Sequence, residues 1–100
     1  MILLDLNPLL PLSQLRELLL QLPQGYTFNE SEVLEFLSRR RYPDDNRLIN
    51  RTTFWRWRND CKIEHQKVFS RLDVFKLCQI CDHYRINGRR SEYLAWISHN

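Results

Sequence analysis

The sequence has too few turn-forming residues for a fold built from many strands. Its 100 residues include two glycines and four prolines, whereas multi-stranded folds need turn signals at short intervals. It also lacks an apolar run near the roughly 20 residues that a membrane-spanning helix requires. The leucine-rich start has no basic leader and is interrupted by Asp5, Pro8 and Pro11, which is not typical of a secretory signal. The sequence therefore predicts a mainly α-helical protein of the cytoplasm that has no membrane partner.

Catalytic and cofactor motifs are also missing. The sequence contains no glycine-rich phosphate loop, nucleophile elbow or cluster of metal-binding carboxylates. The acidic pair Asp44-Asp45 lies in a stretch with Pro43 and Asn46, where a turn explains it. Three cysteines cannot all pair within one chain, which fits reduced intracellular thiols. We expect neither enzymatic activity nor a bound cofactor.

One set of residues has the ligand types and spacing of a zinc site. Cys61 and His65 are separated by three residues, and Cys78 and Cys81 by two, as in tetrahedral zinc sites. Cys78 and Cys81, however, lie in the middle of the apolar stripe of a predicted helix. Buried cysteines commonly serve packing alone. Packing is therefore the preferred interpretation, and zinc is the alternative.

Positive charge is concentrated in the middle of the chain. The net charge is −4 over residues 1–38, +6 over residues 39–71 and +1 over residues 72–100. An arginine-rich basic segment attracts polyanions such as nucleic acids. A solvated basic face without a ligand would carry the same charges. The choice between the two depends on the helix within this segment.

Apolar periodicity and capping signals place the helices. The N-caps of the first three are expected at Ser13, Asn29 and Asn50, and Ser70-x-x-Asp73 is a capping box that opens the fourth. The polar stretch 61–69 is expected to form a small β-hairpin. The predicted helices are, in chain order, 12–22, 29–41, 51–60, 70–85 and 91–98.

The helix predicted at 51–60 has an unusual outward face. At about 100° per residue, Phe54, Trp57 and Cys61 face the core. The opposite face carries a large aromatic ring, and such rings are rarely left in water without a function. Packing of that ring on the N-terminal leucines or on another subunit is the alternative. The outward residues are Thr52, Trp55, Arg56 and Asn59.

This outward face suits the major groove of DNA. Arginine donates two hydrogen bonds to guanine, asparagine pairs with adenine, and threonine reaches a phosphate or a thymine methyl group. A tryptophan ring can lie along the backbone with its N–H on a phosphate. Arg51 and Arg58 flank the face as candidate phosphate contacts, and Arg47 completes the predicted DNA-binding residues of this region.

The same stretch resembles a known family. Residues 50–63 resemble the second helix and following turn of MerR-type winged helix-turn-helix regulators, with the Thr53-Phe54 pair, Trp57 and Ile63 in matching places. Residues 67–74 resemble the wing strand and the start of the next helix in that family. The pattern continues at Leu77, Ile80 and Gly88.

The resemblance covers residues 29–97. It implies a winged helix-turn-helix with a short β-hairpin wing, as in excisionase-like relatives, and an added N-terminal apolar helix. By position it assigns base contacts to Thr52, Trp55 and Arg56. The usual glycine after the recognition helix is Cys61 here, and the turn before that helix is lengthened. Neither the family's long dimerisation helix nor its effector domain is evident, so metal or drug sensing is not expected. The wing residues by position are Lys62, His65, Gln66 and Lys67.

Two units are expected, an apolar arm and helix over residues 1–28 and the DNA-binding domain over residues 29–100. Residues 1–22 contain eleven leucines and one isoleucine, more apolar surface than a small domain needs. We therefore expect a homodimer built through this segment, with Leu72 and Phe75 as a candidate docking surface. Packing of the segment on its own subunit is the alternative.

Together these observations predict a sequence-specific double-stranded DNA-binding transcriptional regulator. Repression by occlusion is the simplest mode, acting at the nucleoid in the cytoplasm. Two alternatives stay open. One is an excisionase-like architectural factor of a mobile element, which would bend DNA. The other is a protein–protein adaptor whose basic face meets an acidic partner.

Overall fold

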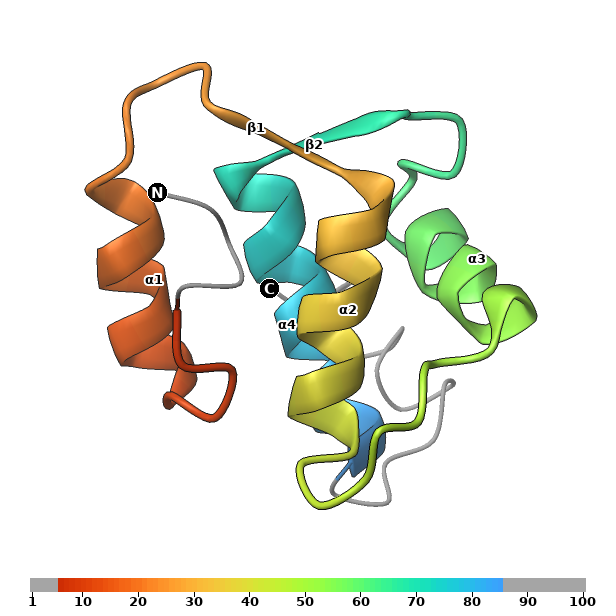
Figure 1. Ribbon diagram of the computed structural model, residues 1–100. Coiled ribbons are helices and arrows are strands. Elements are labelled where there is room, and N and C mark those ends of the chain that lie inside the picture. The colour runs from red at the N-terminus through yellow and green to blue at the C-terminus, as the bar shows by residue number, and fades with distance from the viewer. Residues whose placement is uncertain (1–5, 86–100) are drawn as a thin grey trace.

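Four helices and one two-stranded sheet make up residues 6–85, the part of the chain that this computed structural model describes (Figure 1). The mainly α-helical expectation is confirmed. The helix expected at 91–98 lies outside the described residues. No helix within 6–85 is long and apolar enough to cross a membrane. In chain order the elements are α1 (Leu12–Leu20), β1 (Thr27–Asn29), α2 (Glu30–Arg41), α3 (Arg51–Asp60), β2 (Val68–Ser70) and α4 (Arg71–Arg85).

Side-chain caps set the starts of α2, α3 and α4, as predicted. The backbone N–H of Glu32 donates to Asn29 Oδ1 at 2.9 Å, and the backbone N–H of Asn29 donates to Glu32 Oε1 at 3.0 Å. This is a complete capping box. Asn50 Oδ1 accepts from the backbone of the first turn of α3. Ser70 and Asp73 exchange the same pair of bonds at the start of α4. Each cap satisfies backbone donors that a helix leaves unpaired.

The start of α1 differs from the prediction. Pro11 holds the N-cap position without a side-chain hydrogen bond, and Ser13 lies inside the first turn. The Pro11 carbonyl accepts from the N–H of Leu15 at 2.9 Å, so the first turn closes earlier than a cap at Ser13 would allow. The helix also ends at Leu20 rather than Leu22.

The sheet joins two segments that are far apart in the sequence. β1 and β2 run antiparallel, with Phe28 opposite Phe69. The predicted hairpin within residues 61–69 is therefore wrong, because only its last residues form a strand and their partner is β1. Phe28 and Phe69 are both buried. Pairing β1 with β2 brings the two rings into one core, which a local hairpin would not achieve.

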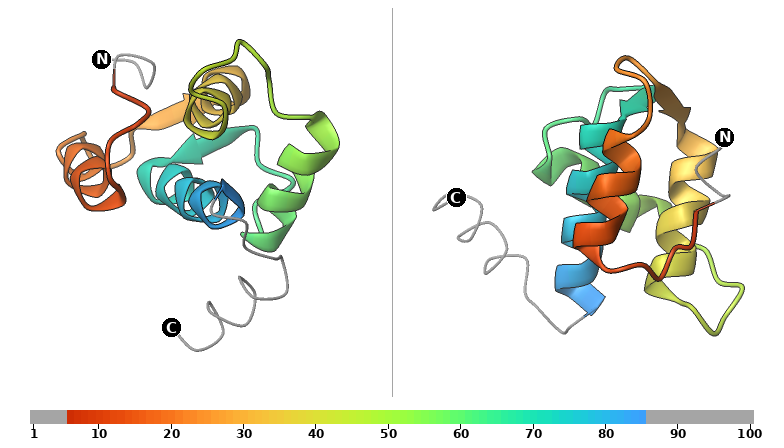
Figure 2. Two further views of the ribbon diagram at one scale, coloured as in Figure 1. Left: turned by 90° about the horizontal axis from the view of Figure 1, so that it is seen from below. Right: turned by 90° about the vertical axis from the view of Figure 1, so that its left-hand side faces the viewer.

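α4 lies at the centre of the molecule, with α1 and α3 on opposite sides of the α2–α4 pair (Figures 1 and 2). α1 packs on α4, and its Leu15 and Leu19 are buried in the same core as Val74 and Leu77 of α4. Leu15, Leu19 and Leu22 thus pack within their own chain, as in the alternative to an intermolecular role.

A buried arginine ties three segments together. Arg40 of α2 donates from Nε and Nη2 to the two carboxylate oxygens of Asp82 in α4, at 2.6 and 2.7 Å. Its Nη1 donates to the carbonyls of Pro8 and Leu10, at 2.8 and 2.7 Å. Burial alone would lower the pKa of Arg40, but the hydrogen bonds to Asp82 and the attraction of Asp82, Cys78 and Cys81 together outweigh it and raise that pKa. The net charge of residues 39–71 does not distinguish Arg40 from the other bases of that segment.

Loss of this arginine should cost far more stability than loss of its neighbour. We expect Arg40→Ala to lower the free energy of unfolding by about 3–5 kcal/mol, because Asp82 is left charged and buried without a partner. Arg39→Ala is the matched control. Its exposed pair with Glu35 (2.8 Å) should contribute no more than about 0.5 kcal/mol. Urea denaturation measures both. Equal losses in the two variants would contradict the role given to Arg40.

Candidate nucleic-acid interface

The inner face of α3 is anchored by aromatic packing. Phe54 and Trp57 are buried, Trp57 with 4% of its surface exposed, as the helical wheel predicts. The Trp57 ring stacks on Tyr84 of α4, with the ring planes 4° apart and the centroids 5.9 Å apart. Phe54 packs on Phe69 with a centroid distance of 6.4 Å. These contacts fix the rotation of α3 about its own axis.

The outer face of α3 is open to solvent. Thr52, Trp55, Arg56 and Asn59 are all exposed and follow the spacing of a single helix stripe. Trp55 exposes 51% of its surface. α1 lies on the opposite side of the molecule (Figure 1), so Trp55 does not pack on the leucines of that helix. We call these four residues the α3 stripe. Arg51, beside the stripe at the start of α3, is exposed as well.

Arg58 is not the outward phosphate contact that was expected. It exposes 8% of its surface and donates from Nη2 to the carbonyls of Glu64 and Gln66, at 2.8 and 2.6 Å. Its guanidinium lies 5.5 and 5.2 Å from the ring centroids of Phe54 and Phe69. Residue 58 falls one turn after Phe54, at the edge of the core face, so its side chain turns toward the following loop. Arg58 therefore holds the loop in place.

The loop after α3 presents the residues that were assigned to a wing. Lys62, His65, Gln66 and Lys67 are exposed on the stretch whose carbonyls Arg58 binds. α3 ends in a Schellman motif, with the N–H of Ile63 donating to the Arg58 carbonyl at 2.9 Å. The left-handed residue of this motif is Lys62, with φ of 60°. Cys61, at φ of −89°, therefore does not occupy the position that favours glycine.

The loop before α3 is fixed by one serine of α2. Ser38 Oγ donates to the carbonyl of Leu34 at 2.7 Å and accepts from the N–H of Ile49 at 2.9 Å. Arg47, also in this loop and exposed, places its guanidinium 4.7 Å from the ring centroid of Tyr42. This is a cation–π distance. Arg47 is thus held against Tyr42 near the end of α2, rather than on α3 itself.

The four residues of the zinc alternative are not gathered. Cys61 is half-buried at the end of α3, whereas the His65 side chain is 94% exposed. Cys78 and Cys81 are buried within α4. Burial raises the pKa of the Cys78 thiol, which disfavours the thiolate that a metal requires. Among residues 6–85, no group of three or more His, Cys, Asp or Glu side chains is placed to hold a metal ion.

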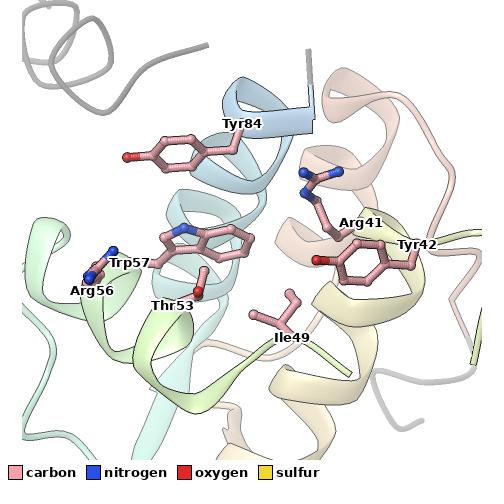
Figure 3. A pocket seen from close by; sticks show the side chains of 7 residues that line it. All are labelled: Arg41, Tyr42, Ile49, Thr53, Arg56, Trp57 and Tyr84. Atoms are coloured by element: carbon pink, nitrogen blue, oxygen red, sulfur yellow. The ribbon is translucent and has the colours of Figure 1, made fainter. Parts of the chain in front are cut away.

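Beside the inner edge of α3 lies a cavity of about 330 Å³ (Figure 3). Residues from the end of α2, the following loop, α3 and α4 surround it, so it exists only in the folded chain. The sequence places Trp57 on the core face of its helix, but no local pattern indicates that residues of three other segments meet it. The lining residues are Arg41, Tyr42, Ile49, Thr53, Arg56, Trp57 and Tyr84.

Comparison with known proteins adds no relative: no family model, no curated protein and no solved structure matches this chain. The resemblance to MerR-type regulators accordingly stays a prediction from the sequence. The geometry of α3 and of its two flanking loops is therefore the basis for a functional proposal.

Arg58 and Arg56 of α3 should differ in how much each contributes to the free energy of unfolding. Arg58→Ala should lower the free energy of unfolding by about 1–3 kcal/mol or more, because the carbonyls of Glu64 and Gln66 lose their charged donor. Arg56→Ala, two residues earlier, should change it by no more than about 0.5 kcal/mol, since that side chain is exposed. Thermal and urea denaturation provide the measurement. The opposite order would mean that α3 is rotated relative to this description.

Proposed function

We propose that this protein is a sequence-specific double-stranded DNA-binding regulator that reads the major groove with the α3 stripe. The observation that carries the proposal is the exposure of Trp55 and Arg56 on a helix whose other face is anchored by buried rings. Covering the exposed apolar surface of a tryptophan ring with a partner lowers the free energy. A helix that cannot rotate presents such side chains in one defined direction.

The stripe carries complementary groups for base edges and backbone. Arg56 suits guanine and Asn59 suits adenine, while Thr52 reaches a phosphate or a thymine methyl group. Trp55 would lie along the sugar-phosphate backbone and donate its indole N–H to a phosphate. From Thr52 to Asn59 the helix rises by about 10 Å, which corresponds to roughly three base-pair steps. One copy of α3 would therefore read only a short half-site.

The flanking loops supply backbone contacts in this proposal. Arg51 lies at the N-terminal end of the stripe, where the helix dipole also favours a phosphate. Lys62, His65, Gln66 and Lys67 follow α3 on the loop that Arg58 holds, and we assign them to the wing of a winged helix-turn-helix. In this assignment the wing is a loop leading into β2. The connection between α2 and α3, residues 42–50, is longer than the usual three or four residues of a helix-turn-helix.

Repression by occlusion of a promoter is the simplest mode of action, with the protein at the nucleoid in the cytoplasm. Use of the same stripe to bend DNA, as an excisionase-like architectural factor, would leave the contacts unchanged. Tryptophan and arginine are also favoured at protein interfaces. A protein adaptor is therefore the competing function that the binding experiment must separate.

Because one α3 covers a short half-site, we further propose that two copies pair to read two half-sites about one helical turn apart. Leu15, Leu19 and Leu22 are buried in the core of their own chain, but Leu20 of α1 and Leu72 of α4 stay exposed, Leu72 to 61%. Phe75 lies beside them, and a small hollow between α1 and α4 is lined by all three. We assign the subunit contact to this apolar patch.

DNA affinity should depend on salt and on the stripe. For a duplex selected from a random library, the logarithm of affinity should fall with the logarithm of salt by about 0.9 per phosphate contacted. Arg56→Ala should weaken specific binding by about 1–3 kcal/mol. Arg39→Ala removes the same charge from α2, outside the stripe, and should have little effect on specificity.

Fluorescence anisotropy with duplex and single-stranded DNA makes this measurement. Salt-independent binding to acidic proteins with no duplex binding would favour the adaptor. Tighter binding to single strands would instead indicate a base-stacking surface. A bent duplex, detected by energy transfer between its ends, would identify the architectural factor.

The dimer should depend on the apolar patch. Leu72→Glu should convert a dimer to a monomer in light scattering, because an apolar contact is lost and a charged side chain would have to leave water at the paired surface. Leu48→Glu places the same charge at an exposed leucine of the loop before α3 and should leave the mass unchanged. Point substitution is preferable to deletion of residues 1–11, since the Pro8 and Leu10 carbonyls bind Arg40. A monomeric wild-type protein at high concentration would refute the pairing.

A further inference from the structure

The cavity beside α3 contains cationic groups that lack an anionic partner. Arg41 and Arg56 line it, and the guanidiniums of Arg41 and Arg47 lie 5.1 and 4.7 Å from the ring centroid of Tyr42, another lining residue. Within residues 6–85, no carboxylate forms an ion pair with any of these three arginines. By contrast, Arg39, Arg40 and Arg58 each pair with a glutamate or aspartate. Within the described residues, these arginines thus leave unpaired positive charge at the cavity.

The walls of the cavity are aromatic. Trp57 and Tyr84 stack with nearly parallel rings, and Tyr42 stands across from Trp57 in the view of Figure 3. The same view shows the Arg41 guanidinium and the Tyr42 hydroxyl on one side of the space and the indole of Trp57 on the other. Thr53 adds a hydroxyl from α3. Flat aromatic surfaces next to guanidinium groups suit a ligand that is both planar and anionic.

The size of the cavity limits the ligand. Its volume of about 330 Å³ is near the lower end of small-molecule sites, which run from about 300 to 1,000 Å³. That size suits a one- or two-ring acid.

We propose that this cavity binds a small planar aromatic carboxylate. The carboxylate lies on the Arg41 guanidinium, which offers paired N–H donors to two oxygens, and within reach of the Thr53 hydroxyl. The ring lies against Trp57, between α2 and α3. Ile49 closes the lower end of the cavity, and Arg56 borders it from α3.

Arg56 connects this cavity to the DNA-binding stripe. The same side chain lines the cavity and belongs to the α3 stripe, so a bound anion changes the electrostatic surroundings of a guanidinium that the proposal also uses on DNA. This consequence rests on the proposed DNA-binding function, whereas ligand binding itself does not. By linkage, a ligand that weakens DNA binding is itself weakened by DNA to the same factor. One ligand typically changes the affinity for the other by about 5–150-fold.

Calorimetry on the full chain without DNA tests the site. The probes are benzoate, 1-naphthoate and indole-3-carboxylate, with indole-3-carboxamide as the uncharged match of the last. We expect at least one acid to bind with a Kd of about 1 mM or tighter, and the carboxamide to bind at least about tenfold more weakly. The Trp57 indole N–H resonance should shift on binding, which places the probe beside that ring.

Two arginine variants and inorganic phosphate provide the remaining comparisons. Arg41→Gln should weaken the acid by about tenfold or more, whereas Arg39→Gln, on the paired exposed arginine, should leave its affinity unchanged. Failure of all three acids to saturate at about 10 mM, or equal affinity for acid and carboxamide, overturns the proposal. Inorganic phosphate binding as tightly as the acids also overturns it, since the ring would then contribute nothing. The carboxamide comparison uses the wild-type chain and stands even where a variant fails to fold.

A second arm measures DNA affinity with and without the acid that binds. A drop of about fivefold or more supports the shared use of Arg56. Unchanged DNA affinity with a filled cavity overturns the coupling and leaves the binding site. Absence of any DNA binding overturns the proposed function alone, because the calorimetric result is obtained without DNA.

Discussion

The fold depends on the hydrogen bonds that Arg40 makes inside the core. Hydrophobic contacts hold α2 and α4 together but are not directional, so many sliding arrangements have similar free energies. A buried guanidinium tolerates only arrangements in which its donors and its charge are satisfied. Bonded to Asp82 and to the carbonyls of Pro8 and Leu10, Arg40 allows one register of α2, α4 and the N-terminal stretch. α3 packs on that frame, so the direction of its stripe follows from it.

Arginine serves three different purposes in this chain. Arg40, Arg58 and Arg71 donate to backbone carbonyls in loops and at helix ends, where no ladder satisfies those carbonyls. Arg56 is exposed on α3, and Arg41 lines the cavity. The +6 charge of residues 39–71 therefore overstates the charge free to meet a polyanion. Arg41 and Arg56, which form no ion pair within residues 6–85, lie at the two proposed binding sites.

The proposed DNA surface and the proposed ligand cavity lie on two sides of the same short helix. Trp57 faces the cavity from the inner side of α3, while Trp55 is exposed on the outer side. Arg56 lies between them and takes part in both. A helix fixed in rotation by stacked rings makes such sharing effective, because a change at one edge is not absorbed by turning of the helix. This arrangement would give a small domain a way to sense a ligand without a separate effector module.

The bounds of α2, α3 and α4 and the two faces of α3 could be predicted from local signals in the sequence. Caps such as Asn29 and Ser70 act within four residues, and helical periodicity is a local property. Tertiary structure alone decided the rest. β2 pairs with β1 rather than with its neighbour, Arg58 turns inward to the loop, and Arg41, Thr53 and Tyr84 meet around one cavity. These outcomes depend on which distant segments share the core, and a buried charge or ring takes its direction from partners that the local sequence does not contain.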